Sequence, residues 1–321
     1  MKQDKKTVSI LIPTYNEEEN AQAVYEAVRN VMVSELGEYE YEIVFIDNKS
    51  TDNTRSIIEH ICAEDKNVKA IFNQRNFGQF NSPYYGLLQT TGDCVILFCA
   101  DFQDPVDMIP KFVHEWRNGY KVVIGVKSSS KESPVMYFLR SVYYKILRKM
   151  STADIIEHYT GFGLYDKSFI RTLRELGDPT PFIRGIVAEL GPERKEIEYT
   201  QQARKAGHTH NNFSTLYDAA MLSFTSYTKA GMRVATFFGF LISVLSFLIG
   251  FVFLILKLLM WDKFVMGYSP ILISVYFIGG ILLLFLGFLS EYVMSMNARI
   301  MKRPLVVEER RINFETKDDI Q

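Results

Sequence analysis

The sequence is poor in cysteine and carries no strong charge of either sign. It has three cysteines among 321 residues, Cys62, Cys94 and Cys99, and a formal net charge of -1. So few thiols argue against a disulfide framework and fit a reducing compartment. The balanced charge, without a long basic block, gives no indication of nucleic-acid binding. The chain also lacks internal repeats and low-complexity linkers, and the early apolar stretch that ends at Pro13 is too short for a signal peptide.

Long apolar runs are confined to the last third of the chain. Residues 234–256 and 264–290 carry no charge. A helix of the first length is about 35 Å long, enough to cross a hydrocarbon core of roughly 30 Å. Buried core helices are the alternative, but helices this long and apolar on every face are rare in soluble domains. We therefore predict transmembrane helices at 234–256 and 266–290, joined by a short extracytoplasmic hairpin at 257–265.

Basic residues set the predicted orientation of these spans. The hairpin offers chiefly Lys263, whereas the segment after the second run holds Arg299, Lys302, Arg303, Arg310 and Arg311. The positive-inside rule places this C-terminal tail, residues 291–321, in the cytosol. Two spans then place a large N-terminal domain, residues 1–214, in the cytosol as well, with juxtamembrane helices at 215–233. We expect a multi-pass protein of the cytoplasmic (inner) membrane with both termini cytosolic.

The first half of the chain alternates short apolar runs with helical patterns. Strands are predicted at 8–13, 41–47, 68–73, 94–100 and 121–126, and helices at 18–35, from 51 or 52, at 81–90 and at 107–118. Near-continuous apolar strands that alternate with helices are typical of a parallel sheet covered on both faces. The fold class is therefore α/β, and ligands are expected beyond the carboxyl ends of the strands.

Polar clusters follow three of these strands. They read PTYNEEEN from residue 13, DNKSTDNT from residue 47 and ADFQDP from residue 100. Each cluster taken alone could be a helix start or an ordinary loop, but the placement of all three on one edge of a sheet favours a binding site. Asp101 and Gln103 lie two apart and offer oxygen ligands of the kind that Mg²⁺ or Mn²⁺ prefers. Asp104 is expected to cap the helix that follows.

The order of these motifs carries a family resemblance. IPTYNEEEN, FIDNKSTDNT, RNFGQ, TGDCVILFCADFQDP and GFGLYDKS together resemble family 2 glycosyltransferases with the GT-A fold. The segment SEYVMSMNARIMKRPLVVEE and the paired apolar runs are similar to one branch, the polyprenyl-phosphate glycosyltransferases, which include bactoprenol glucosyltransferases and dolichyl-phosphate mannose synthases. The likeness covers residues 7 to 314.

The resemblance implies an inverting hexosyltransferase of cell-envelope polysaccharide synthesis. It would move a sugar from a UDP- or GDP-linked donor to a polyprenyl phosphate, undecaprenyl phosphate, at the cytosolic face of the lipid bilayer, and it would form a homotetramer. Two alternatives stay open. One is a glycosyltransferase that acts directly on a growing polysaccharide, and the other is a catalytically impaired membrane scaffold that binds nucleotide sugars.

The resemblance also implies roles for single residues. The nucleotide-sugar site would comprise Pro13, Tyr15, Glu17, Asp47, Asn48, Arg75 and Asp101. Asp101 and Gln103 would hold Mg²⁺ or Mn²⁺ at the diphosphate. Asp101, Lys127 and Arg204 are the candidate catalytic residues. The lipid phosphate would be bound by Lys127, Lys131, Arg204 and His210.

Two positions depart from the family pattern. The usual Asp-x-Asp triplet reads Cys99-Ala100-Asp101 here, and we expect Cys99 to be a buried strand end rather than a metal ligand. Gly161 stands where relatives place an Asp that is often assigned as a base. A phosphate acceptor has a second pKa of about 6, so it arrives ionised and needs no strong base. Asp166 is expected to cap the following helix.

The sequence leaves the roles of two further features undecided. His208 and His210 lie two apart without a third ligand nearby, which is weak support for a metal site. Residues 134–150 form an amphipathic, aromatic and basic segment, which we read as membrane-interfacial, with a surface helix packed on the sheet as the alternative.

Overall fold

The computed structural model describes residues 5–129, 156–191, 193–202, 268–301 and 303–314, together with residue 221 and short pieces between 237 and 259. The chain divides into two compact units. The first comprises Met1–Tyr144, Ala153–Asn212 and Met301–Gln321, and the second comprises Lys145–Thr152 and Phe213–Ile300. Predicted features at 130–155 and 203–220, including Lys131, Arg204 and His210, lie outside the described residues.

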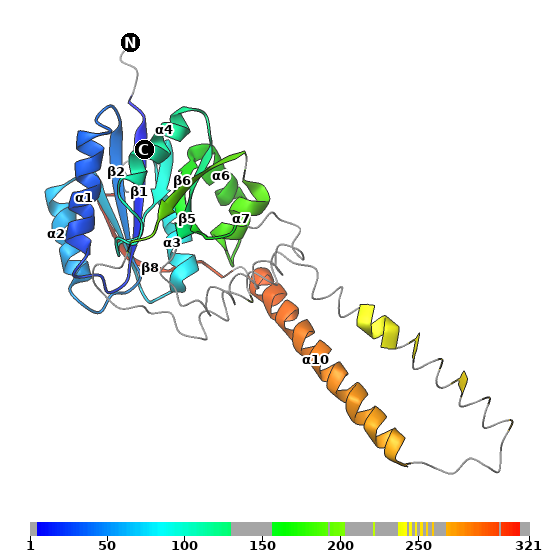
Figure 1. Cartoon of the computed structure of the whole chain (residues 1–321). Helices are drawn as coiled ribbons and strands as arrows, with labels where there is room; N and C mark the ends of the chain where they lie inside the picture. The colour runs from blue at the N-terminus through cyan, green and yellow to red at the C-terminus, as the bar shows by residue number, and fades with distance from the viewer. Residues whose placement is uncertain are drawn as a thin grey trace. The chain divides into compact units, whose positions relative to one another are not determined.

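An eight-stranded sheet in the order β7-β5-β6-β4-β1-β2-β3-β8 forms the centre of the first unit (Figure 1). The strands are β1 (Thr7–Thr14), β2 (Glu40–Asp47), β3 (Val68–Asn73), β4 (Cys94–Leu97), β5 (Val122–Ser129), β6 (Tyr159–Asp166), β7 (Arg194–Thr200) and β8 (Glu308–Ile312). β1 pairs in parallel with β2 and β4, as do β2 with β3 and β5 with β7, whereas β6 and β8 are antiparallel to their neighbours. The prediction of a mostly parallel sheet is confirmed.

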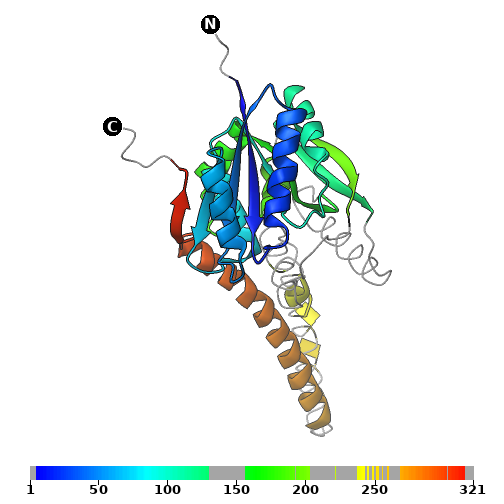
Figure 2. The ribbon, with the colours of Figure 1, turned by 90° about the vertical axis from the view of Figure 1, so that its left-hand side faces the viewer.

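Helices cover both faces of this sheet (Figure 2). They are α1 (Ala21–Ser34), α2 (Thr54–Glu64), α3 (Gly78–Gln89), α4 (Met108–Arg117), α6 (Lys167–Leu176) and α7 (Ile183–Leu190). Side chains alternate along each strand, so Ile10 and Phe45 join the core cluster that also contains buried residues of α1, α2 and α4. Leu11 and Ile46 point to the other face, where they lie against Gly86 of α3. Burial on both faces explains the near-continuous apolar runs.

The register brings the strand ends together at one edge. β1 and β2 are aligned over their whole length, from Thr7 opposite Glu40 to Thr14 opposite Asp47. Asp47 in turn lies opposite Phe72 of β3. The polar clusters that follow β1 and β2 therefore begin side by side, as the strand-end rule predicts.

Three local expectations for the end of β4 and the loop after it are wrong. β4 ends at Leu97, so the predicted strand at 94–100 is too long, and Cys99 is exposed rather than a buried strand end. Asp104 does not cap α4, because the N-cap position is Asp107 and Asp104 is buried instead. The expectation for Asp166 is confirmed, since it is the N-cap of α6 and accepts a hydrogen bond from the Ser168 amide.

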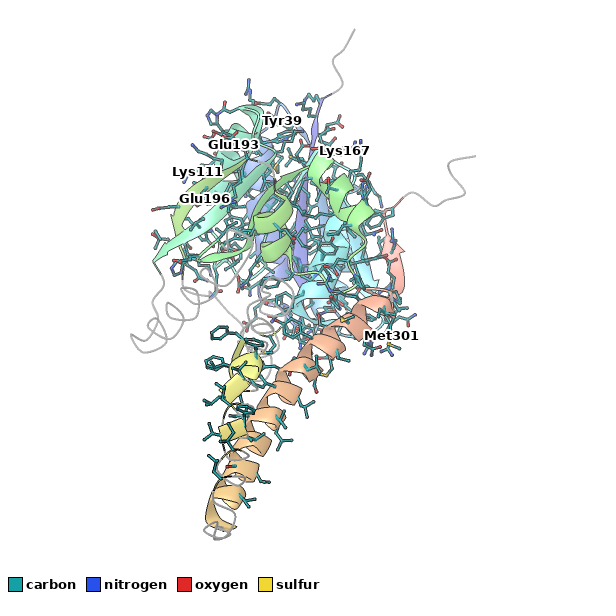
Figure 3. All side chains as sticks on the ribbon, turned by 90° about the vertical axis from the view of Figure 1, so that its right-hand side faces the viewer. Tyr39, Lys111, Lys167, Glu193, Glu196 and Met301 are labelled. Carbon is teal, nitrogen blue, oxygen red and sulfur yellow. The ribbon has the colours of Figure 1, made fainter. Side chains whose placement is uncertain are left out.

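The second unit contains α10 (Tyr268–Ile300), an unbroken helix of 33 residues. Figure 3 shows side chains that are almost all carbon along most of it. Within the described residues, Ile278–Ile300 is the stretch that is long and apolar enough to cross a membrane, with mean hydropathy 1.8 and none of it buried. The predicted span at 266–290 lies largely within α10, but the helix continues through residue 300, so residue 290 is not a structural boundary. Of the 23 residues of the first predicted span, 234–256, 11 lie outside the described residues, and this span stays a prediction.

Candidate active site

The loops that follow β1 and β2 are joined by reciprocal hydrogen bonds. The amide of Asn16 donates to Ser50 Oγ over 2.9 Å, and the amide of Thr51 donates back to Asn16 Oδ1 over 2.8 Å. The amide of Glu17 donates to Thr54 Oγ1 over 2.8 Å. Asn16 adopts a left-handed φ of 54°, which asparagine tolerates better than most residues. The loops 15–20 and 48–54 thus form one rigid rim, which we call the nucleoside rim.

Asp47 lies beneath this rim and is fully buried. Its carboxylate accepts from Ser50 Oγ, from the Ser50 amide and from Arg55 Nε at 2.6 Å. These bonds satisfy the charge that burial would otherwise penalise. A nucleobase that binds Asp47 must therefore share the carboxylate with these partners.

Asn48 links the rim to the chain after β3. Its side-chain amide donates to Asn76 Oδ1 over 2.8 Å, and its Oδ1 accepts from the Phe77 amide over 2.9 Å. The same oxygen accepts from Asn73 Nδ2 over 3.2 Å. Across the described residues, Asn73 Oδ1 is the buried side-chain atom without a hydrogen-bond partner. Arg75 is exposed, and its guanidinium lies 4.6 Å from the centroid of the Phe77 ring.

Two residues at the nucleoside rim were missed from the sequence, Arg55 and Glu309. Arg55 Nη1 donates to Glu309 Oε2 over 3.0 Å, and Lys49 Nζ donates to the same carboxylate over 2.9 Å. Glu309 belongs to β8, which pairs with β3 at the sheet edge. Part of the predicted cytosolic tail is therefore a strand of the eight-stranded sheet.

A second group of polar residues lies where β4, β5 and β7 end; we call it the phosphate end. Asp101 is 8% exposed, and its Oδ1 accepts from the Gln103 amide over 3.2 Å. Gln103 is fixed from β7, because Gln201 Nε2 donates to its Oε1 over 3.0 Å and the Gln202 amide donates to its carbonyl oxygen over 3.0 Å. The structure thus brings the predicted metal ligands to the end of the sheet.

Asp104 is the buried carboxylate of the phosphate end. Tyr199 Oη donates to its Oδ1 over 2.5 Å, and Tyr199 lies opposite Lys127 in the β5–β7 pairing. Burial raises the pKa of Asp104, although the hydrogen bond from Tyr199 and the charge of Lys127 oppose the rise. Burial likewise lowers the pKa of Lys127, against the pull of Asp104. The sequence placed Asp104 on a helix cap, so its part in this cluster was missed.

Arg184, at the start of α7, was also missed. Its positive charge acts on Lys127, together with the carboxylates of Asp104 and Asp101. Its guanidinium lies 5.8 Å from the centroid of the Phe182 ring. The charge of Arg184 helps to lower the pKa of Lys127, and the positive charge of both residues favours a bound anion such as phosphate.

Gly161 has a φ of 104°, a conformation that side chains rarely adopt. A Cβ atom there would lie 3.4 Å from Ile183 Cγ2 and 3.6 Å from Leu97 Cδ2, both ordinary contacts. Its carbonyl oxygen accepts from Tyr165 Oη over 2.6 Å. Backbone conformation, rather than space, therefore disfavours an Asp at this position.

The donor set fits a cation that is shared with substrate, not an all-protein cage. No group of three or more His, Cys, Asp or Glu in the described part of the chain is arranged to hold a metal ion. Magnesium commonly uses one or two carboxylates plus substrate phosphates, and Asp101 with Gln103 match that pattern.

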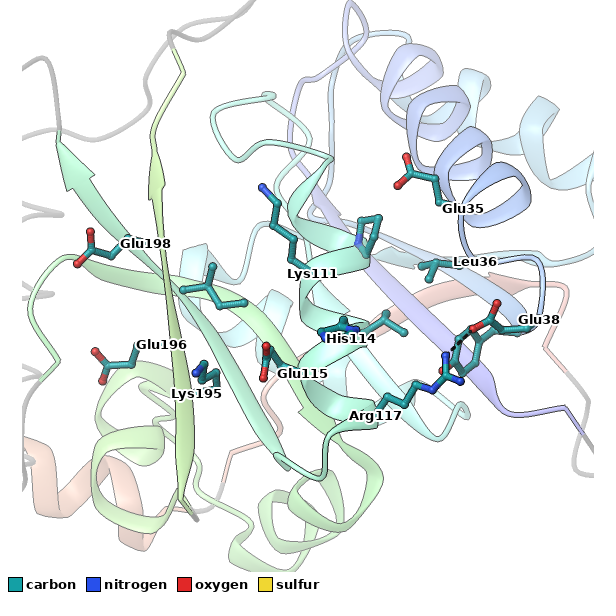
Figure 4. A pocket seen from close by; sticks show the side chains of 14 residues that line it. Glu35, Leu36, Glu38, Lys111, His114, Glu115, Arg117, Lys195, Glu196 and Glu198 are labelled. Carbon is teal, nitrogen blue, oxygen red and sulfur yellow. Dashed lines mark hydrogen bonds and ion pairs between the residues drawn. The ribbon is translucent and has the colours of Figure 1, made fainter.

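A separate groove lies between the end of α1, α4 and β7 (Figure 4). Lys111, His114 and Arg117 line it from α4, and Lys195 and Glu196 from β7. None of the predicted site residues lines this groove. It is a feature of the surface apart from the strand ends.

Known proteins resemble this chain over nearly its whole length. The family model described as glycosyl transferase family 2 matches residues 9–174. The bactoprenol glucosyl transferase of Shigella phage SfX is 33% identical over 298 residues, which cover 92% of this chain and 97% of that protein. A prophage bactoprenol glucosyl transferase homolog of Escherichia coli K12 is 31% identical, covering 94% of this chain and 98% of the homolog.

Among solved structures, glucosyl-3-phosphoglycerate synthase from Mycobacterium tuberculosis, in complex with Mn²⁺, UDP-glucose and phosphoglyceric acid, matches with a TM-score of 0.47 and 16% identity. The match covers 68% of this chain and 78% of that one. The family model and the phage and prophage relatives establish that the chain belongs to glycosyl transferase family 2.

Proposed function

We propose that this protein transfers a sugar from a nucleotide diphosphate sugar to a polyprenyl phosphate at the cytosolic face of the membrane. The observation that carries the proposal is the phosphate end, where Asp101 is hydrogen-bonded to Gln103, and where Tyr199, which donates to Asp104, lies opposite Lys127. Relatives named bactoprenol glucosyl transferases support a lipid acceptor. The apolar stretch Ile278–Ile300 supports a membrane anchor, with the predicted two spans and cytosolic termini as its topology.

The donor would lie along the strand ends. Pro13, Tyr15, Glu17, Asp47 and Asn48 would bind the nucleoside at the nucleoside rim, with Arg75 nearby. This assignment is supported by their position in and beneath the joined loops. Specificity for UDP or GDP would depend on how a base shares the buried acceptors of Asp47 and Asn73.

The diphosphate would lie at the phosphate end. Asp101 and Gln103 would hold Mg²⁺ or Mn²⁺, which neutralises charge on the diphosphate when bound. Lys127 would contribute positive charge to the leaving group, and its partial desolvation strengthens that interaction. Arg204, Lys131 and His210, which lie outside the described residues, stay candidates for the lipid phosphate.

The reaction would be a direct displacement with inversion. An oxygen of the acceptor phosphate forms a bond to the anomeric carbon while the bond from that carbon to the nucleotide diphosphate breaks. The phosphate monoester, whose second pKa is about 6, is already ionised near neutral pH, so no side chain has to remove a proton. Gly161 in place of an acidic residue is consistent with this chemistry.

The experiment is to incubate the purified full-length protein with undecaprenyl phosphate, Mn²⁺ or Mg²⁺ and a panel of radiolabelled UDP- and GDP-sugars. We expect a lipid-linked sugar with at least one donor and none with the Asp101→Ala variant. Extension of a free glycan without any lipid-linked product would overturn the proposal in favour of a polysaccharide-extending enzyme. Binding of a nucleotide sugar without turnover, in the presence of every acceptor, would instead indicate a scaffold.

A further inference from the structure

Arg55, near the start of α2, is held by three different parts of the sheet. Its Nε donates to the buried Asp47, its Nη2 donates to the carbonyl oxygen of Asn73 over 2.7 Å, and its Nη1 donates to Glu309. The guanidinium also lies 5.3 Å from the centroid of the Phe72 ring. A guanidinium presents donors in a fixed planar fork, so these contacts determine its position.

Glu309 is the residue of β8 that reaches the nucleoside rim. Its carboxylate bridges Arg55 and Lys49, which are 16% and 43% exposed. Lys49 lies in the rim and has a left-handed φ of 67°, an unfavourable conformation for lysine that its surroundings must stabilise. Glu309 therefore fixes both a strained residue of the loop and the arginine that pairs with Asp47.

Other residues of β8 anchor the strand without touching the rim. Arg310 pairs with Glu59 of α2, and its guanidinium lies 4.7 Å from the centroid of the Phe72 ring, which Arg55 also contacts. Arg311 pairs with Glu308 and donates to Gln89 of α3 over 2.7 Å. Backbone pairing with β3 adds to these contacts. Docking of the strand is thus provided separately from the contact that Glu309 makes with the rim.

We propose that Arg55 and Glu309 are positioning residues for the sugar-nucleotide donor, so that the C-terminal strand sets donor affinity by holding residues 48–54 in their binding conformation. The inference rests on the proposed function only in assigning the donor nucleoside to this rim. The chain enters β8 soon after α10, so the element that follows the membrane-spanning candidate also completes the wall of the nucleotide site. Without these contacts, residues 48–54 would lose conformational entropy when the donor binds, which lowers donor affinity without altering the chemical step.

The test compares point variants of the full-length protein. Glu309→Gln keeps the size of the side chain but removes its charge, and Glu309→Asp is the conservative variant. Arg55→Lys keeps a cation for buried Asp47 but cannot reach three acceptors. Glu308→Gln and Arg311→Gln are matched controls on the same strand, since Glu308 and Arg311 pair with each other and Arg311 also donates to Gln89 of α3, away from the rim. Each variant is measured for donor KM and kcat, for UDP and GDP affinity by calorimetry, and for hydrogen exchange of residues 48–54.

We expect Glu309→Gln to raise the donor KM and the nucleotide Kd about fivefold with kcat unchanged, as removal of two partly exposed ion pairs allows. Arg55→Lys should raise them more, by about tenfold. Glu309→Asp should recover part of the loss, the two controls should match wild type, and hydrogen exchange at 48–54 should quicken only in the Glu309 and Arg55 variants.

Equal effects of Glu308→Gln and Glu309→Gln, or a fall in kcat at constant KM, would overturn the inference. So would unchanged hydrogen exchange in Glu309→Gln. If wild type bound no nucleotide, the proposed function would fail, while the exchange measurement would still decide whether Glu309 holds the loop. The two failures are therefore distinguishable.

Discussion

The two ends of the site are stabilised by different forces. At the nucleoside rim, buried and half-buried polar groups are satisfied by several specific hydrogen bonds each, as with Asn16, Asp47 and Arg55. At the phosphate end, charges of both signs lie close together under partial burial, and the pKa values of Asp104 and Lys127 are shifted toward their neutral forms. Hydrogen bonds therefore define the conformation of the rim, whereas closely spaced charges determine the properties of the phosphate end.

This difference suggests how each end meets its ligand. A rim whose hydrogen bonds are already made loses little conformational entropy when a nucleoside binds. At the phosphate end, partial burial disfavours the charged form of Lys127. A bound diphosphate would stabilise that charged form, because an opposite charge compensates for the lost hydration. Substitutions at the two ends should therefore act on different kinetic constants, which makes the comparison testable.

The largest expected effect is at Asp101. Asp101→Ala should reduce turnover by about a thousandfold or more, because it removes the carboxylate predicted to hold the metal at the diphosphate. Cys99→Ser should change turnover by less than about threefold, since a thiol is a poor ligand for Mg²⁺ and serine preserves a hydrogen-bonding group of similar size. Rates of lipid-linked product formation check both variants. Equal losses in the two would mean that Cys99 serves the metal.

The next prediction compares one hydroxyl at each end. Tyr199→Phe removes the hydroxyl that donates to the buried carboxylate of Asp104 and should cost about 1–3 kcal/mol of unfolding free energy, with a lower kcat. Ser50→Ala removes bonds to Asp47 and to the Asn16 amide, but Asp47 keeps Arg55. It should cost about 1 kcal/mol and raise the donor KM at constant kcat. Denaturant unfolding with steady-state kinetics measures both, and the reverse assignment of kcat and KM would contradict the comparison.

Variants of Gly161 test whether the reaction would be faster with a basic side chain at this position or needs none. Gly161→Asp should destabilise the fold by about 1–3 kcal/mol through its left-handed φ of 104°. Turnover should not rise, since the acceptor is already ionised. Gly161→Ala is the control, because it carries the same backbone cost without a carboxylate. Faster turnover in Gly161→Asp than in Gly161→Ala and wild type would show that a base is wanted there.

Features with a local signal could be predicted from the sequence. Strand β3 lies at the predicted residues 68–73, and the strand-end rule located Asp47, Asp101 and Gln103 at one edge of the sheet. These follow from apolar periodicity and from the direction of parallel strands, both of which neighbouring residues encode.

Features that depend on residues far apart in the chain could not be predicted from the sequence. β8 reads EERRI, without the apolar alternation that marks a strand, and its charges are matched by residues some 250 positions earlier, as in the pair of Arg310 and Glu59. Asp104 resembled a helix cap because it precedes Pro105, and only the position of Tyr199 on β7 makes it part of a buried cluster. The signal that was available for β8 was the pair Val306 and Val307 before a charged run, which is weak by itself.

The smallest expected effect is the response of the rim to acid. Lys49 and Arg55 lower the pKa of Glu309 to about 2, from an ordinary value of 4.5. A carboxylate whose pKa is lower in the folded state contributes stability above its unfolded value, and the contribution is lost as the pH falls from 4.5 toward 2.

The difference in melting temperature between wild type and Glu309→Gln should therefore be constant from pH 7 to about pH 5 and shrink below it. Asp104 has the opposite sign, since burial raises its pKa in the folded state and acid favours the form that the fold prefers. On acidification the rim should loosen first, so hydrogen exchange, corrected for its intrinsic pH dependence, should rise at residues 48–54 before it rises around Asp104. The opposite order would mean that the phosphate end, rather than the rim, depends on ionised carboxylates for its structure.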